Sequence, residues 1–198
     1  MAGIIRLANA ADCVAFAEIY RPAVTDSATS FEIVPPDAAE MSRRIEKRLE
    51  WAPWLAYVVD GSVAGYAYGS AFRDRPAYQW SVEVSAYVAA HTRGKGVGRS
   101  LYETLFALLV LQGFRSVYAG ITLPNAASVA LHTSVGFTQV GVYRNVGFKS
   151  GAWHDVAWFE RTIAPHESSP HPPIPLSDEA MQRQVRNALG RQARVADI

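Results

Sequence analysis

The sequence is poor in cysteine, in long apolar runs and in net charge. Cys13 is the only cysteine among 198 residues, which excludes an internal disulfide and a cysteine-rich metal site. The longest unbroken apolar run, Leu105–Leu111, is too short to cross a bilayer. Met1–Leu7 lacks the basic start and the apolar core of a signal peptide. The 19 Lys and Arg nearly balance the 18 Asp and Glu, so we expect a cytoplasmic protein that binds neither nucleic acid nor membrane.

A glycine-rich stretch, Arg93–Gly98, is the feature around which the chain is organised. It lies between Val82–Val88, which alternates like a strand, and an apolar run from Leu101 to Leu108 that reads as a helix. Its three glycines let the backbone approach a ligand closely, and the helix start behind them offers free N–H groups to an anion. From these residues alone, the stretch is either a phosphate cradle or a turn that only connects a strand to a helix.

The expected elements mix strands and helices. A first helix should stop near Tyr20, because Pro22 follows, and a second should run from the cap Asp37 to about Glu50. The other expected strands are 1–7, 55–59, 63–68, 80–88, 117–121, 137–143 and 154–161, and the other expected helices run from the glycine stretch to Gly113 and over 126–135. This order predicts an α+β fold with a mixed central sheet flanked by helices.

One carboxylate lies in the middle of an expected strand. Because side chains alternate, the apolar residues of Val82–Val88 share one face, and Glu83 lies on the other. A carboxylate is unusual in that position. Glu83 is therefore either a catalytic base or a structural partner of a nearby arginine such as Arg73.

The C-terminal region differs in composition from the rest. We divide the chain into a domain at 1–164, a proline-rich linker at 165–176 that should not pack, and a helix or tail at 177–198. An apolar stripe that includes Met181, Val185 and Leu189 indicates an accessory helix that docks on the body or on a partner, and a frayed tail is the alternative. His166 and His171 lie in the linker, and we expect no metal site.

The glycine stretch and the order of elements resemble the GCN5-related N-acetyltransferase (GNAT) superfamily. Arg93, Gly96 and Gly98 occupy the positions of its acetyl-CoA signature. The resemblance covers residues 4 to 162. Within it, the chain is similar to the phosphinothricin and methionine sulfoximine N-acetyltransferases in blocks that occur in the right order: Trp80–Ser85, Tyr87–Val88, Gln112–Val117, Leu123–Asn125, Ser128, His132, Gly136–Phe137 and Trp153–Val156. Separate blocks in order are more specific than one glycine motif.

The resemblance implies acetyl-CoA as the co-substrate and suggests residues that bind it. The backbone of Ala86, Tyr87 and Val88 should pair with the pantetheine amides. The pyrophosphate should be held by the amides of the stretch and its neighbour: Arg93, Gly94, Lys95, Gly96, Val97, Gly98 and Arg99. Asn125 and Ser128 could bind the same arm, cap the following helix, or do both.

Two residues are catalytic candidates by the same resemblance. Acetyl transfer needs a neutral amine, so a base must remove a proton, and Glu83 is the candidate, directly or through a water. His132 replaces the tyrosine that donates a proton to the coenzyme A thiolate in many members of the superfamily. It either acts near the thiol or the amine, or is a helix histidine that faces solvent.

The acceptor is expected to be an amino-acid analogue, whose carboxylate requires a guanidinium. Arg73 and Arg75 lie in the segment that contributes basic residues in the family, although two arginines beside a proline can also be merely exposed. Phe31, Tyr78 and Trp80 are the aromatic candidates. The alternatives are transfer to a protein N-terminus or another amine, or a non-catalytic acyl-CoA-binding module. The family also suggests a homodimer.

Overall fold

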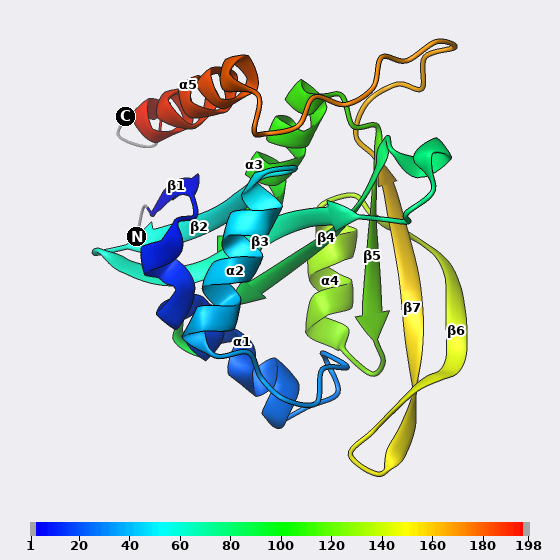
Figure 1. Cartoon of the computed structure of the whole chain (residues 1–198). Helices are drawn as coiled ribbons and strands as arrows, with labels where there is room; N and C mark the ends of the chain where they lie inside the picture. The colour runs from blue at the N-terminus through cyan, green and yellow to red at the C-terminus, as the bar shows by residue number, and fades with distance from the viewer. Residues whose placement is uncertain (1–2, 196–198) are drawn as a thin grey trace.

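The computed structural model describes residues 3–195 and contains a seven-stranded mixed sheet in the order β1-β2-β3-β4-β5-β7-β6 (Figure 1). The strands are β1 Ile4–Leu7, β2 Trp54–Val59, β3 Ser62–Ala71, β4 Ser81–Val88, β5 Ser116–Thr122, β6 Thr138–Lys149 and β7 Ala152–Thr162. The α-helices are α1 Cys13–Thr25, α2 Ala38–Leu49, α3 Val97–Gln112, α4 Ala126–Ser134 and α5 Glu179–Val195. All neighbouring strands are antiparallel except β4 and β5. The expected α+β fold is confirmed.

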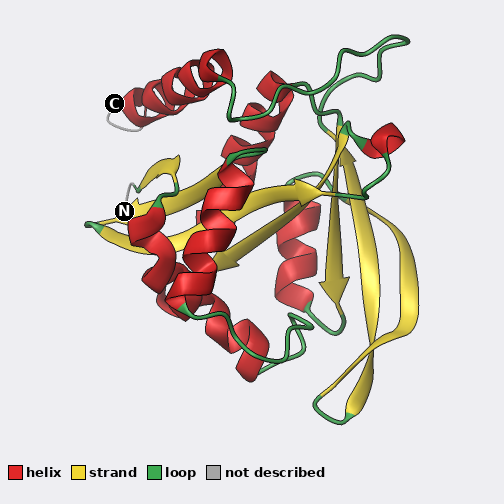
Figure 2. Ribbon diagram, in the orientation of Figure 1, coloured by secondary structure: helices red, strands yellow, loops and turns green. Residues whose placement is uncertain are grey.

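Helices cover both faces of the sheet (Figure 2). One face of β2 and β3, which includes Trp54 and Tyr66, packs against Phe16 of α1 and Ile45 of α2. The opposite face, with residues such as Leu55, packs against α3 in the main core. Alternation therefore places the apolar residues Val82 and Val84 of β4 towards α3 and Glu83 on the face that α1 and α2 share.

The first helix is longer than expected. It continues through Pro22 to Thr25, so the prediction that it stops near Tyr20 is wrong. Proline cannot donate the hydrogen bond that the Glu18 carbonyl would normally accept. Glu18 is exposed, so water can take that place, and packing of Tyr20 and Val24 in the core favours the additional turn.

Strands β6 and β7 form a hairpin that extends well past the segments expected for them. A register irregularity between Tyr143 and Gly147 interrupts the pairing, and the stretch between them contains polar residues without strict alternation. The strands expected from alternation were therefore too short. Pairing between β6 and β7 extends the hairpin to Lys149 and Ala152.

The C-terminal region packs against the body. The prediction that the proline-rich segment does not pack is wrong: the carbonyl of Ile174 accepts a hydrogen bond from the Gln112 side chain, and that of His171 accepts one from the Trp80 indole. Helix α5 lies against α3 and β1 and buries Met181 and Val185. An apolar stripe thus anchors it, and the alternative of a frayed tail does not describe residues 179–195. Within the described residues, no helix is long and apolar enough to cross a membrane.

Candidate active site

Strands β4 and β5 pair only at their beginnings. Parallel pairing joins Ser81–Glu83 to Ser116–Tyr118, whereas the pairing of β4 with β3 continues to Val88. The backbone groups of Ala86–Val88 on the β5 side therefore have no strand partner and can bond an extended ligand as a further strand would. Glu83, the last residue of the parallel register, lies where the two strands diverge.

A cavity of about 810 Å³ extends from this opening to the glycine stretch. Gly94 and Gly96 have φ values of 75° and 82°, which favour glycine. Helix α3 begins directly behind them, and its N-cap Gly96 has no side chain to occupy the first N–H groups. A Cβ on Gly98 would lie 2.9 Å from Leu131 Cδ2, so this glycine permits the close packing of α3 on α4. Free amides and a helix dipole suit a diphosphate, and these residues fit that of coenzyme A.

Helix α4 forms the opposite wall of the cavity with Asn125, Ser128 and His132. Asn125 Oδ1 accepts a hydrogen bond from the Ser128 amide at 3.1 Å, so Asn125 caps the helix. The Ser128 hydroxyl lies 3.4 Å from His132 Nδ1 and at the border of the cavity. Capping and ligand binding by this pair are therefore compatible.

His132 is buried, so the alternative of a histidine facing solvent is wrong. Its Nδ1 lies 2.8 Å from the Ser128 carbonyl and must carry the proton that this acceptor needs. Its Nε2, 2.9 Å from the Tyr102 hydroxyl, then accepts a hydrogen bond from it. Burial lowers the pKa of His132 below the ordinary 6.5, which favours the neutral ring. Both ring nitrogens are therefore hydrogen-bonded within the protein.

Glu83 is half-buried, and its carboxylate forms no ion pair within the part of the chain that the structure describes. The alternative of a structural pair with Arg73 is therefore not seen. Burial raises the pKa of Glu83 above the ordinary 4.5, and the charges of Arg73 and Arg48 oppose that rise. A carboxylate with a raised pKa and no partner suits proton abstraction.

The family was tested by comparison with known proteins. Residues 5–158 match the model of the "Acetyltransferase (GNAT) domain". The chain belongs to the GNAT acetyltransferase family. It is similar to phosphinothricin N-acetyltransferase of Streptomyces viridochromogenes, with 38% identity over 87% of this chain and 92% of that protein. It is 36% identical to the L-methionine sulfoximine/L-methionine sulfone acetyltransferase of Salmonella typhimurium, over 82% of this chain and 95% of that one.

A solved structure agrees with this assignment. The GNAT phosphinothricin acetyltransferase of Sinorhizobium meliloti, in complex with acetyl-CoA, superposes with a TM-score of 0.80 at 35% identity, covering 89% of this chain and 99% of that chain. The protein is accordingly an N-acetyltransferase with acetyl-CoA as co-substrate, and the resemblance read from the sequence is confirmed.

In this GNAT chain, the segment between β3 and β4 carries the expected acceptor residues. The Arg73 guanidinium lies 4.3 Å from the Phe72 ring centroid and 5.5 Å from that of Trp158. Tyr78 packs edge-on against Phe72, with 5.9 Å between the centroids. Arg73 and Arg75 are both exposed. Arg73 is the one with ring contacts and with a charge that acts on Glu83.

The aromatic candidates Phe31 and Trp80 are engaged elsewhere. The Phe31 ring covers Gly147 of β6, where a Cβ would lie 2.2 Å from Phe31 Cε2. The Trp80 indole donates to the His171 carbonyl at 2.9 Å, in the proline-rich segment. A direct contact of Phe31 with an acceptor stays a prediction, and Trp80 holds the C-terminal region.

Sequence reasoning missed Lys149, which joins the hairpin to the loop after α1. Its buried ammonium donates to the carbonyls of Val24 and Ser30 at 2.7 and 2.6 Å. Together with the Phe31–Gly147 contact, these bonds hold the loop at 26–37, part of which borders the large cavity. A lysine at the end of a hairpin gives no local signal, because its partners lie more than 100 residues away: 125 for Val24 and 119 for Ser30.

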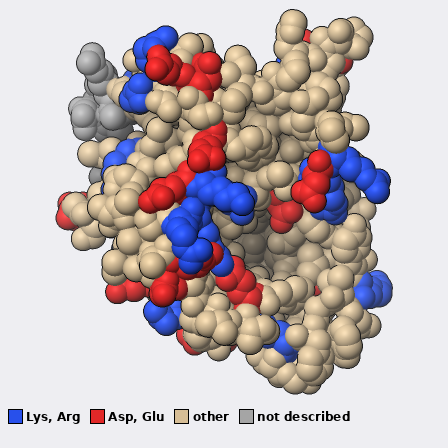
Figure 3. All heavy atoms as spheres, viewed as in Figure 1, with Lys and Arg blue, Asp and Glu red and all other residues tan. Residues whose placement is uncertain are grey.

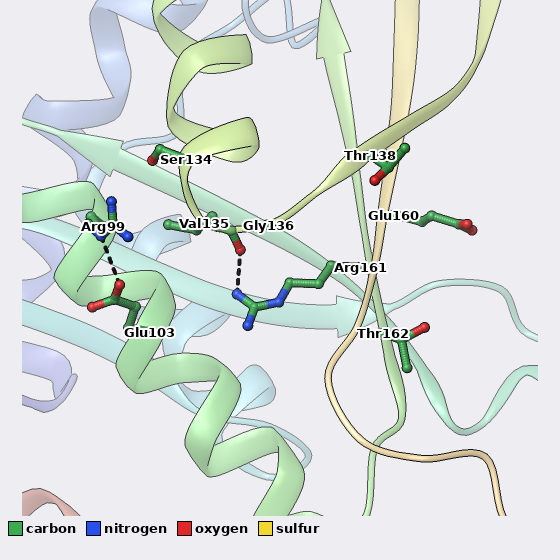
Figure 4. Close-up of a pocket in the computed structure, with 9 residues that line it drawn as sticks. All are labelled: Arg99, Glu103, Ser134, Val135, Gly136, Thr138, Glu160, Arg161 and Thr162. Carbon is green, nitrogen blue, oxygen red and sulfur yellow. Dashed lines mark hydrogen bonds and ion pairs between the residues drawn. The ribbon is translucent and has the colours of Figure 1, made fainter.

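A second groove lies beside α4, between α3 and β7 (Figure 4). On one side Arg99 pairs with Glu103 at 2.8 Å, and on the other the Arg161 guanidinium donates to the Val135 carbonyl at the end of α4. Arg161 also lies over the Phe106 ring. These charged groups have structural partners. The lining of the groove includes neither Glu83 nor any residue of the glycine stretch, and Arg99 is the neighbour of that stretch.

Proposed function

We propose that this enzyme acetylates the α-amine of a small amino-acid analogue of the phosphinothricin, methionine sulfoximine or methionine sulfone type. The observation that carries the proposal is the unpaired Glu83 carboxylate at the point where β4 and β5 diverge, three residues before the segment Ala86–Val88 that lines the large cavity. Relatives named for these substrates support the choice.

Glu83 acts as the general base. It accepts a proton from the acceptor ammonium, directly or through a water, and the freed lone pair attacks the thioester carbonyl. A C–N bond forms, the C–S bond breaks, and the electron pair leaves with sulfur. The cavity lining contains no cysteine, since Cys13 lies outside it on α1, which agrees with direct transfer. We assign the neutral Tyr102–His132 pair to the sulfur end of the cavity, whose lining includes His132, and the thiolate takes up the second proton that the nitrogen loses as the amide forms.

Other groups position the two substrates. We assign the pantetheine arm to Ala86–Val88 and Ser128, and the pyrophosphate to the amides of the glycine stretch. The acceptor α-carboxylate is assigned to Arg73, because its guanidinium is fixed between two rings and acts on the carboxyl of Glu83. Arg75, Tyr78 and Phe31 stay predicted contacts of the acceptor.

An acceptor screen tests the reaction. Purified protein is incubated with acetyl-CoA and either phosphinothricin, methionine sulfoximine, methionine sulfone, a polyamine or a peptide with a free N-terminus, and release of coenzyme A thiol is followed. We expect turnover with the first three amines. Turnover confined to the polyamine or the peptide would contradict the proposal and favour the corresponding alternative. Acetyl-CoA binding by calorimetry without any turnover would indicate a binding module.

We also propose a homodimer formed through the β6–β7 hairpin. β6 is an edge strand of the sheet, and the hairpin exposes five large apolar side chains by half or more: Val140, Tyr143, Val146, Phe148 and Trp153. Such a concentration on one exposed edge favours pairing with a second copy of the same surface. A cytoplasmic location stays a prediction.

Light scattering after size exclusion tests the dimer. Wild-type protein should elute with twice the mass of one chain, and Trp153→Asp, at a side chain 61% exposed, should shift it towards one chain at unchanged circular dichroism. Val14→Asp on α1, also more than half exposed, is the matched control and should leave the mass unchanged. A wild-type monomer would refute the dimer.

A further inference from the structure

A small cavity of about 270 Å³ lies between α2 and the sheet, on the same face as Glu83. Its lining is aromatic and charged: Tyr20, Glu32, Met41, Arg44, Arg48, Trp54, Tyr66 and Tyr68. Figure 3 shows basic and acidic side chains gathered over α2 beside a hollow in this face. The size of the cavity suits one functional group rather than a whole cofactor.

One arginine in the lining of this cavity has no ion pair among the described residues. Glu32 is bound by Arg44 at 2.7 Å and by the Tyr20 hydroxyl at 2.9 Å, and Glu40 also pairs with Arg44. Arg48 forms no ion pair with any residue that the structure describes, and its guanidinium lies 5.2 Å from the centroid of the Tyr68 ring. One positive charge is therefore left without a carboxylate beside the cavity.

A donor without a partner lines the same cavity. The indole of Trp54 is 2% exposed, and its Nε1 has no hydrogen-bond partner among the residues that the structure describes. Indole is a donor only, and an unpaired buried donor carries a free-energy cost of about 1–3 kcal/mol that an acceptor would remove. A free cation together with an unpaired N–H group selects an oxoanion or another oxygen-rich group.

The cavity adjoins the reaction centre. Tyr68 of β3 pairs with Ser85 of β4, and the next pair on the same face is Ser70 with Glu83. Neighbouring pairs on one face lie about 7 Å apart. The charges of both Arg73 and Arg48 act on the Glu83 carboxyl, with Arg73 the stronger.

We propose that Arg48, with Trp54 and Tyr68, forms a subsite for an anionic oxygen group at the end of the acceptor side chain, while Arg73 takes the α-carboxylate. The subsite rests on the proposed function, because it presumes an amine held at Glu83. The subsite would favour amino acids whose side chain ends in an oxoanion, such as the phosphinate of phosphinothricin. Amino acids whose side chain ends in a neutral sulfone would bind less well.

The test compares two acceptors in three proteins. Arg48→Gln should raise the KM for phosphinothricin about tenfold or more, which corresponds to about 1.4 kcal/mol, and change the KM for methionine sulfone less than about threefold. The KM for acetyl-CoA and the kcat with both acceptors should stay within about twofold. Arg43→Gln is the matched control, since Arg43 lies on α2 with its side chain 73% exposed and pairs with Glu40. It should change none of these constants.

A binding measurement separates the subsite from the reaction. Phosphinothricin is titrated by calorimetry into wild-type and Arg48→Gln protein, each saturated with coenzyme A. Binding that weakens at least tenfold in the variant supports the subsite, whether or not an acetyl group is transferred. Absence of acetyl transfer would overturn only the proposed reaction. Equal affinities of wild-type and Arg48→Gln protein for phosphinothricin would overturn the subsite, and so would equal KM changes for the anionic and the neutral acceptor. Turnover in the wild type would still support the reaction. Failure of wild-type protein to bind phosphinothricin overturns both.

Discussion

Replacement of Glu83 by glutamine is expected to lower kcat about 100-fold or more, because general-base catalysis contributes about 10²–10⁴-fold. Glutamine keeps the size of the side chain and cannot accept the proton. The KM values for acetyl-CoA and for the acceptor should change less than about threefold, since neither the glycine stretch nor Arg73 is altered. Steady-state kinetics by thiol release measures all three constants.

The pH dependence gives the same variant a second readout. Burial raises the pKa of Glu83 above 4.5, and the base acts only when it is deprotonated. Wild-type kcat/KM should therefore fall as the pH drops through that raised pKa, at a higher pH than for an exposed carboxylate. In Glu83→Gln this limb should disappear, and the remaining rate should rise with pH as more of the free amine becomes neutral.

Glu160→Gln is the matched control for this prediction. Glu160 is an exposed carboxylate on β7 in the groove of Figure 4, two strands from Glu83 in the same row of the sheet, because Tyr118 of β5 pairs with both. Its replacement should leave kcat within about twofold. Unchanged kcat in Glu83→Gln, or an acidic limb that persists in it, would remove Glu83 from the role of base.

Deletion of residues 165–198 is expected to destabilise the protein by at least about 6 kcal/mol. The deletion removes four apolar side chains that are at least nine-tenths buried in the main core, namely Leu176, Met181, Val185 and Leu189. Each such burial contributes about 1.5–3 kcal/mol, and whole domains are stable by about 5–15 kcal/mol. Urea unfolding followed by tryptophan fluorescence measures the loss.

A point variant keeps this prediction testable if the shortened chain does not fold. Leu176→Ala, at a side chain 2% exposed, should lower the free energy of unfolding by about 2–5 kcal/mol. Arg183→Ala on the exposed side of α5 should change it by less than about 0.5 kcal/mol. If the shortened chain instead has the same unfolding midpoint as the full chain, residues 1–164 fold independently. That result would agree with the domain at 1–164 that we expected from the composition of the sequence.

Much of the active site could be predicted because the relevant rules are local. Alternation along β4 was enough to separate Glu83 from the core face, and three closely spaced glycines before an apolar helix indicated either an anion site or a turn. Family resemblance then decided between a cradle and a turn. Arg48 was read as part of a solvated face, since a charged run on an amphipathic helix carries no sign of the cavity beneath it.

The sequence by itself determined the family and the strand that carries Glu83, and it predicted the donor site, because side-chain alternation, ordered motifs and glycine conformation are properties of short segments. Only the tertiary structure decided that β4 and β5 part after Glu83, that Lys149 holds the loop after α1, and that the proline-rich segment binds Trp80. Those contacts join residues between 35 and 125 positions apart. Their formation depends on the register and packing of whole elements, which no local pattern records.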